Sequence, residues 1–243
     1  MEDHEVGKRQ FLRHICGGGA AVGLTMLLGN AHAATGGKTS LTAQQVLALL
    51  KEGNANYLTE SPIQAVEGKK RRLEIARSQS PMAVLVSCSD SRVPPELLFG
   101  RGLGELFIVR NAGNTIDTVA QGSVEYAVAQ LGVPLIVVMG HERCGAVDAA
   151  LSVVERNVSF PGSIGRMIEP IIPAVLSAKA SLQKKTPPTR DALLDASVRA
   201  NVSRVVARLR GEEMLLESVR SKRLMIVGAR YDLDDGKVDF FDV

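Results

Sequence analysis

The sequence contains no tryptophan, only 4% aromatic residues and only three cysteines among 243 residues. It also lacks a strong excess of basic charge, because 29 basic side chains are balanced by 26 acidic ones, which disfavours a nucleic-acid binder built on basic patches and stacking rings. Three cysteines cannot form a disulfide framework, and a chain of this length buries a core without one. The 45% hydrophobic and 23% charged residues are typical of one globular domain, so chemistry on a small molecule becomes the leading class of function.

The start of the chain has the pattern of an export signal. Lys8-Arg9 is followed by a glycine-diluted apolar stretch over Ile15–Leu28, and Ala31-His32-Ala33 has the small-x-small pattern of a processing site. The segment resembles a twin-arginine signal. Lys8-Arg9 stands where two arginines are usual, so both the twin-arginine and the general secretory route stay open.

A retained membrane anchor is the alternative, and we rank it second because so short and glycine-rich a segment spans a bilayer poorly. We expect residues 1–33 to be a removable signal peptide and residues 34–243 to form a single domain. The mature protein is then expected to be periplasmic or otherwise exported, with no stable membrane insertion and no nucleic-acid partner.

Apolar runs of strand length alternate with amphipathic, helix-like stretches along the rest of the chain. Runs without polar alternation are typical of strands buried on both faces. The pattern predicts strands over 82–88, 106–109, 135–140 and 224–227, and helices over 40–58, 66–78, 117–131, from near Gly145, and on both sides of a connection over 184–190. Alternating strands and helices favour an α/β fold around a mostly parallel sheet flanked by helices.

Removal of the signal would leave one histidine, His141, and two cysteines, Cys88 and Cys144. Cys88 and His141 each close a predicted buried strand, so both are expected at the carboxyl edge of the sheet, where ligands bind in such folds. Two thiolates and one imidazole suit Zn²⁺ and leave its fourth coordination position open. A Cys88–Cys144 disulfide is the main alternative in an oxidising compartment, but it would leave His141 unexplained.

Several motifs together resemble the β-class carbonic anhydrases. They are Cys88-Ser-Asp90-Ser-Arg92, Arg110-Asn-Ala-Gly-Asn114, Gly122-Ser-Val-Glu-Tyr126, His141-Glu-Arg-Cys144-Gly145 and Gly228-Ala-Arg-Tyr-Asp232. The resemblance implies an α/β catalytic domain that assembles as a dimer or tetramer, with one Zn²⁺ per subunit. It also implies the reversible hydration of carbon dioxide to bicarbonate by zinc-bound hydroxide.

The resemblance also implies roles for individual residues. Asp90 and Arg92 are expected to be catalytic: Asp90 either accepts a proton or, in a closed state only, ligates the metal, and Arg92 decides which by pairing with it. The substrate-binding positions are Gln79, Phe107, Ala112, Tyr126 and Gly145.

One departure from the family concerns a non-catalytic bicarbonate site. Some members of the family hold such a bicarbonate with a tryptophan, an arginine and a tyrosine. Arg110 and Tyr231 match two of these residues, but Leu85 stands at the tryptophan position, so the sequence does not establish that site. Two other functions stay open at this point. The same zinc site could act on carbonyl sulfide or carbon disulfide, or the protein could bind zinc without turnover.

Overall fold

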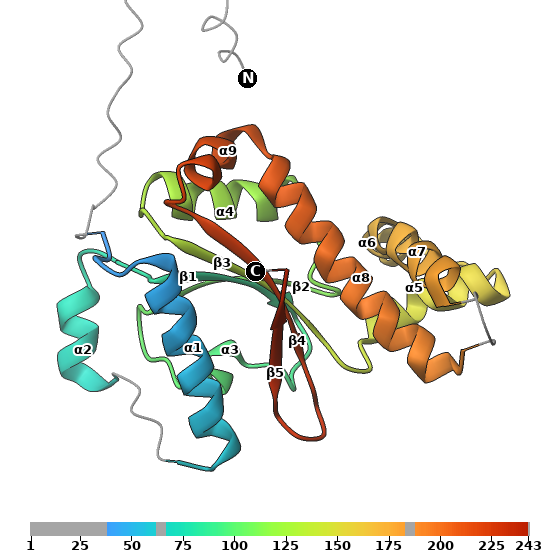
Figure 1. The fold of residues 1–243 in the computed structure, drawn as a ribbon, viewed down its shortest axis with the longest axis horizontal. Helices are drawn as coiled ribbons and strands as arrows, with labels where there is room; N and C mark the ends of the chain where they lie inside the picture. The colour runs from blue at the N-terminus through green and yellow to red at the C-terminus, as the bar shows by residue number, and fades with distance from the viewer. Residues whose placement is uncertain (1–37, 62–66, 183–187, 243) are drawn as a thin grey trace, which may run out of the picture. The chain divides into compact units, whose positions relative to one another are not determined.

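The computed structural model of the protein describes residues 38–61, 67–182 and 188–242 (Figure 1). The expected export signal, residues 1–33, lies outside these ranges, as does most of the connection over 184–190. Within them, no helix combines the length and the apolar character that a membrane span requires.

A five-stranded sheet forms the centre of the described chain. Its strands are β1 (Ala83–Cys88), β2 (Leu106–Asn111), β3 (Leu135–His141), β4 (Met225–Tyr231) and β5 (Val238–Phe241). The order across the sheet is β2-β1-β3-β4-β5, and only β5 runs antiparallel to its neighbour. The prediction of a mostly parallel sheet flanked by helices is confirmed.

The helices are α1 (Ala43–Leu58), α2 (Gly68–Ile75), α3 (Pro95–Leu98), α4 (Thr118–Ala129), α5 (Gly145–Arg156), α6 (Gly162–Ile168), α7 (Ile172–Leu182), α8 (Arg190–Gly211) and α9 (Glu213–Arg220), with a 3₁₀ turn over Glu169–Ile171. Side chains cap the longer ones where the sequence has a suitable residue. Thr42 and Gln45 form a capping box at α1, and Asp117 accepts the Ala120 N–H at α4. None of the residues of α2 is buried, so this lysine- and arginine-rich helix presents its charges to solvent.

Alternate residues of each strand point to opposite faces of the sheet and build two separate cores. Val84 and Val86 of β1 pack with α4, α8 and α9, whereas Ala83 and Leu85 pack with α1 and α3. Figure 1 shows α4, α8 and α9 on one side of the sheet and α1 and α3 on the other. A third apolar cluster joins α5, α7 and the start of α8, and it includes Cys88 and Cys144. The two cysteines therefore belong to a packed region and not to a surface loop.

β1 ends at Cys88 as predicted, but β2, β3 and β4 run further toward their carboxyl ends than the predicted strands. β2 continues through Arg110 and Asn111, and β4 through Arg230 to Tyr231. The predictions stopped before Arg110 in β2 and before Gly228 in β4, where the apolar run was interrupted, but ladder hydrogen bonds need only backbone groups. The short helices α3 and α6, the helix α9 and the strand β5 were not predicted, because their segments are too short or too polar for a periodicity argument.

Candidate metal centre

Three metal-ligating side chains meet at the carboxyl edge of the sheet. Cys88 is the last residue of β1 and His141 the last of β3, and these two strands are hydrogen-bonded neighbours. Cys144 follows one short loop later as the N-cap residue of α5, where the positive end of the helix dipole favours a thiolate. The topology thus brings together the three residues that the sequence predicts as ligands.

The donor atoms of Cys88, His141 and Cys144 all lie within 4.8 Å of one another, and all three residues are buried. Both cysteines are free, with 3.9 Å between their Sγ atoms. The structure therefore contains no Cys88–Cys144 disulfide, and the sulfurs are spaced to share an ion.

The His141 ring is fixed so that one nitrogen is left for a ligand. Its Nδ1 lies 2.9 Å from the Glu142 carbonyl oxygen, which accepts a hydrogen from Nδ1 and leaves Nε2 with a free lone pair. Nε2 is buried and has no hydrogen-bond partner among the described residues. A buried polar atom is rarely left without a partner. Two soft sulfur donors beside this orphaned nitrogen fit Zn²⁺.

The two thiols are not equivalent. The hydrogen bond between the two sulfurs, with a contribution from the Gly113 N–H, lowers the pKa of Cys88 despite its burial. The same bond and burial raise the pKa of Cys144. The site therefore carries one thiolate readily, and a cation is needed to balance a second one.

Asp90 lies beside the ligands and is held by Arg92. The guanidinium donates from Nε to Oδ1 at 2.9 Å and from Nη2 to Oδ2 at 2.8 Å, and the Arg92 backbone N–H also donates to Oδ1. These bonds hold the pKa of Asp90 well below its usual value. Asp90 Oδ2 is 3.8 Å from His141 Nε2, yet the carboxylate is not part of the three-donor group.

Arg110 stabilises the turn that carries Cys88 and Asp90. Its Nε donates to the Cys88 carbonyl at 2.8 Å and its Nη2 to the Asp90 carbonyl at 2.7 Å. Leu85, which precedes Cys88 by three residues on β1, is fully buried in the core. The Arg110 guanidinium is thus already engaged with the backbone that carries Cys88 and Asp90.

Other contacts around the centre could not be assigned from the sequence. The Gly113 N–H donates to Cys88 Sγ at 3.3 Å, and Ala112 lies next to it in the loop after β2. The motif Arg110-Asn-Ala-Gly-Asn114 marked this loop, but only the fold shows which backbone group reaches the sulfur. Gly145, the first residue of α5, follows Cys144 directly and is exposed.

The loop between His141 and Cys144 is braced by the turn between β4 and β5. Arg143, whose φ of +49° is left-handed, pairs with Asp234 through both guanidinium Nη atoms, and the Glu142 carboxylate accepts the Leu233 N–H at 3.2 Å. Arg230 donates to Asp232 at 2.8 Å in the same cluster. Arg143 and Arg230 neutralise the carboxylates of this cluster, so the cluster serves to stabilise the loop.

Three other predicted substrate residues, Phe107, Tyr126 and Gln79, lie away from the metal centre of the same chain. Phe107 precedes Asn111, the register partner of Cys88, by four residues, which corresponds to about 13 Å along the strand. Tyr126 of α4 packs against Phe107, with 6.5 Å between the ring centroids. Gln79 is exposed and precedes the amino end of β1. Within one chain, only Ala112 and Gly145 of the five predicted substrate residues adjoin the ligands.

Comparison with known proteins identifies the family to which this chain belongs. Residues 83–238 match a family model described as carbonic anhydrase. A carbonic anhydrase of Mycolicibacterium smegmatis is 38% identical over 192 residues, which cover 78% of this chain and 89% of the relative. A carbonic anhydrase of Pseudomonas aeruginosa is 38% identical over 174 residues, covering 69% and 76% of the two chains.

Solved structures show the same similarity. A β-carbonic anhydrase of Aspergillus fumigatus superposes with a TM-score of 0.64 at 28% identity, covering 82% of this chain and 90% of the other. Tetrameric β-carbonic anhydrases of Sordaria macrospora include a chain with a TM-score of 0.64 at 25% identity, covering 70% and 85%.

Proposed function

The chain belongs to the β-class carbonic anhydrase family, and from this premise we propose that it catalyses the reversible hydration of carbon dioxide to bicarbonate and a proton at the Cys88–His141–Cys144 centre. The observation that carries the proposal is the buried group of two thiols and an orphaned imidazole nitrogen, with an ionised carboxylate beside it.

Cys88 Sγ, His141 Nε2 and Cys144 Sγ would hold the zinc ion as three protein ligands. When bound, zinc supplies Lewis acidity that brings the pKa of water toward neutrality and so makes hydroxide available as a nucleophile. The burial of all three ligands keeps bulk water from competing for their donor atoms.

Asp90 acts as a hydrogen-bond acceptor that orients the attacking water. Because Arg92 keeps the pKa of this carboxyl low, Asp90 stays ionised at neutral pH and does not store the released proton. If the Arg92 pair opened, the carboxylate would be free to turn toward the ligands, since Oδ2 is only 3.8 Å from His141 Nε2. The Asp90–Arg92 pair would therefore keep Asp90 from competing with water for a bound zinc ion.

The released proton must leave with help from solution. His141 is the one histidine in residues 38–242, and it is occupied as a ligand. With no second imidazole to relay protons, we expect kcat to rise with the concentration of external buffer. Stopped-flow hydration assays over a buffer series at fixed ionic strength measure this, and a kcat independent of buffer would contradict it.

A second copy of the chain would complete the substrate pocket. Edge strand β2 is only partly buried, and on α4 the side chains of Tyr126 and Val119 are 40% and 78% exposed. An apolar edge of this kind favours a partner. Self-association across β2 and α4 would let Gln79, Phe107 and Tyr126 of one chain approach the ligands of another, in keeping with the tetrameric Sordaria relatives.

Export of the mature protein is also part of the proposal, on the pattern of residues 1–33. Cell fractionation with N-terminal sequencing tests it. The function itself is tested by metal analysis of the purified protein together with carbon dioxide hydration in a stopped-flow instrument. A zinc-free protein with joined thiols, or a zinc-loaded protein without turnover, would overturn it.

A further inference from the structure

The long helix α8 carries a buried amide in its apolar stripe. Val198, Val202 and Val205 of this stripe pack into the cores, and Asn201 lies among them with only 1% of its surface exposed. Burying an amide is unfavourable unless it is hydrogen-bonded. Asn201 Nδ2 donates to the Gly113 carbonyl oxygen at 2.9 Å, a contact that spans 88 positions in the sequence.

Gly113 is held tightly on its other sides. Its φ of +82° is left-handed, and a Cβ added there would lie 2.6 Å from Ile171 Cδ1 and 3.1 Å from Ala146 Cβ. The Gly113 residue is therefore wedged between α5 and the 3₁₀ turn. Its N–H donates to Cys88 Sγ at 3.3 Å, while its carbonyl accepts from Asn201.

We propose that Asn201 is a positioning residue for the metal centre: by anchoring the Gly113 carbonyl, it aims the Gly113 N–H at the sulfur of Cys88. The inference rests on the proposed zinc site. A hydrogen bond to a ligand sulfur fixes its orientation and reduces its electron donation, and loss of such outer contacts typically weakens metal binding.

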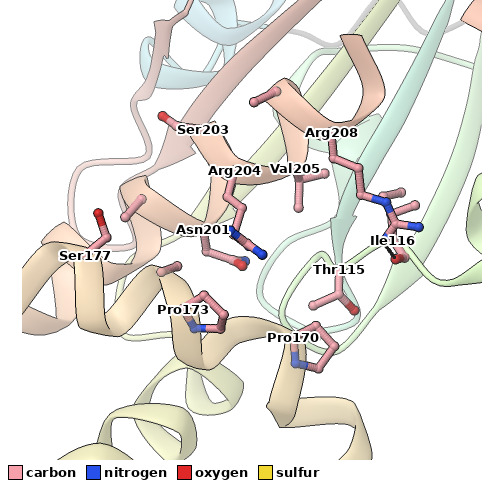
Figure 2. Close-up of a pocket in the computed structure, with 13 residues that line it drawn as sticks. Thr115, Ile116, Pro170, Pro173, Ser177, Asn201, Ser203, Arg204, Val205 and Arg208 are labelled. Atoms are coloured by element: carbon pink, nitrogen blue, oxygen red, sulfur yellow. Dashed lines mark hydrogen bonds between the residues drawn. The ribbon is translucent and has the colours of Figure 1, made fainter. Parts of the chain in front are cut away.

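The surroundings of Asn201 make this contact hard to replace. Asn201 lines a groove of about 690 Å³ that is bounded by α7, α8 and the loop after β2, and Figure 2 shows its side chain together with Thr115 and Pro173 at this groove. No other described residue donates a hydrogen bond to the Gly113 carbonyl. Without the amide, that carbonyl would lose this hydrogen-bond partner, and the Gly113 N–H would be held toward the sulfur less firmly.

The test uses the full mature protein loaded with Co²⁺, whose sulfur-to-cobalt charge-transfer band reports on the ligand sulfurs. Asn201→Asp keeps the shape of the side chain but replaces the donor with an acceptor, and Asn201→Ala removes it. For both we expect a shifted charge-transfer band and a zinc affinity reduced roughly 10-fold, measured against a chromophoric chelator.

Ser197→Ala is the matched control, because Ser197 is buried one turn earlier on the same helix and bonds only to the Leu193 carbonyl. It should lower the melting temperature but leave the cobalt band and the zinc affinity unchanged. If the Asn201 variants behave like this control, the inference is overturned while the proposed function stands. If the wild-type protein binds neither Co²⁺ nor Zn²⁺, both fall.

A measurement on the unmutated protein covers the case in which the Asn201 variants do not fold. In the protein loaded with ¹¹³Cd, a hydrogen bond from Gly113 to Cys88 transmits a scalar coupling between the amide proton and the metal. We expect the Gly113 amide to show this coupling. Its absence would overturn the inference, because Asn201 would then be anchoring a peptide that does not contact the sulfur.

Discussion

The metal centre and the face formed by β2 and α4 are built in opposite ways. The centre is buried, and one chain supplies all three donors together with Asp90, Arg92 and the Gly113 N–H. The β2–α4 face holds the predicted substrate residues Phe107 and Tyr126, which are partly exposed and pack against each other. Phe107 lies about 13 Å along β2 from the register partner of Cys88. The difference teaches that binding the metal and binding the substrate place separate demands on the chain, and in our proposal one copy meets only the first.

The strongest test of this division removes a ligand. Cys144→Ser should abolish zinc binding and reduce hydration by at least about 10³-fold, because two protein donors cannot hold the ion in a catalytic geometry. Self-association should persist, since the β2–α4 face is untouched. Metal analysis and sedimentation of the same sample measure both, with Ser89→Ala as a control next to Cys88. Loss of the oligomer in Cys144→Ser would mean that the two regions depend on each other.

The next test separates ligand residues from their catalytic neighbours. Asp90→Asn and Arg92→Ala should each reduce kcat about 100-fold while zinc content stays near one per chain, because neither residue is among the three donors. Asp239→Asn disrupts a comparable arginine pair, with Arg199 at 2.9 Å, and should leave kcat unchanged. Near-normal turnover in either Asp90→Asn or Arg92→Ala would contradict their assigned roles.

A charge placed on the β2–α4 face should affect self-association and not zinc binding, which is the reverse of the effect expected for Cys144→Ser. We expect Phe107→Asp to leave zinc bound but to weaken self-association, so that activity falls about 10-fold at low protein concentration and recovers as concentration rises. Leu176→Asp, on α7 and 51% exposed, is the matched control outside this face. Activity per chain that does not depend on concentration would show that one copy suffices for the substrate pocket.

The smallest effect concerns the brace of the metal loop. Arg230 lowers the pKa of Asp232 from 3.8 to about 2, so this carboxylate stabilises the fold fully above pH 4 and loses its contribution as the pH falls toward 2. Urea unfolding at pH 6 and at pH 2.5 should show an acid-induced loss that is smaller in Asp232→Asn by about 1 kcal/mol, allowing for partial exposure. An equal acid-induced loss of stability in both proteins would show that Asp232 does not help to stabilise the metal loop.

The sequence predicts the metal ligands better than it predicts the residues that hold those ligands in position. Cys88 and His141 end continuous apolar runs, so their position at the carboxyl edge follows from strand direction alone. Asn201 gives a weaker signal: an amide within an apolar helix stripe indicates a buried partner, but only the tertiary structure identifies Gly113. Motifs likewise mark Gln79 and Phe107 without saying whose metal they face, because a single sequence does not encode which copy of the chain a residue approaches.

The choice of two sulfurs has one more consequence, for the departure of product. Cys88 and Cys144 together contribute two negative charges, which would cancel the two positive charges of a zinc ion, whereas three imidazoles would leave them uncompensated. Bicarbonate is itself an anion, and it would leave a neutral pocket without the Coulombic retention that a dicationic one imposes. The two thiolates would thus make a bound zinc ion less electrophilic, but they would also let bicarbonate dissociate more easily.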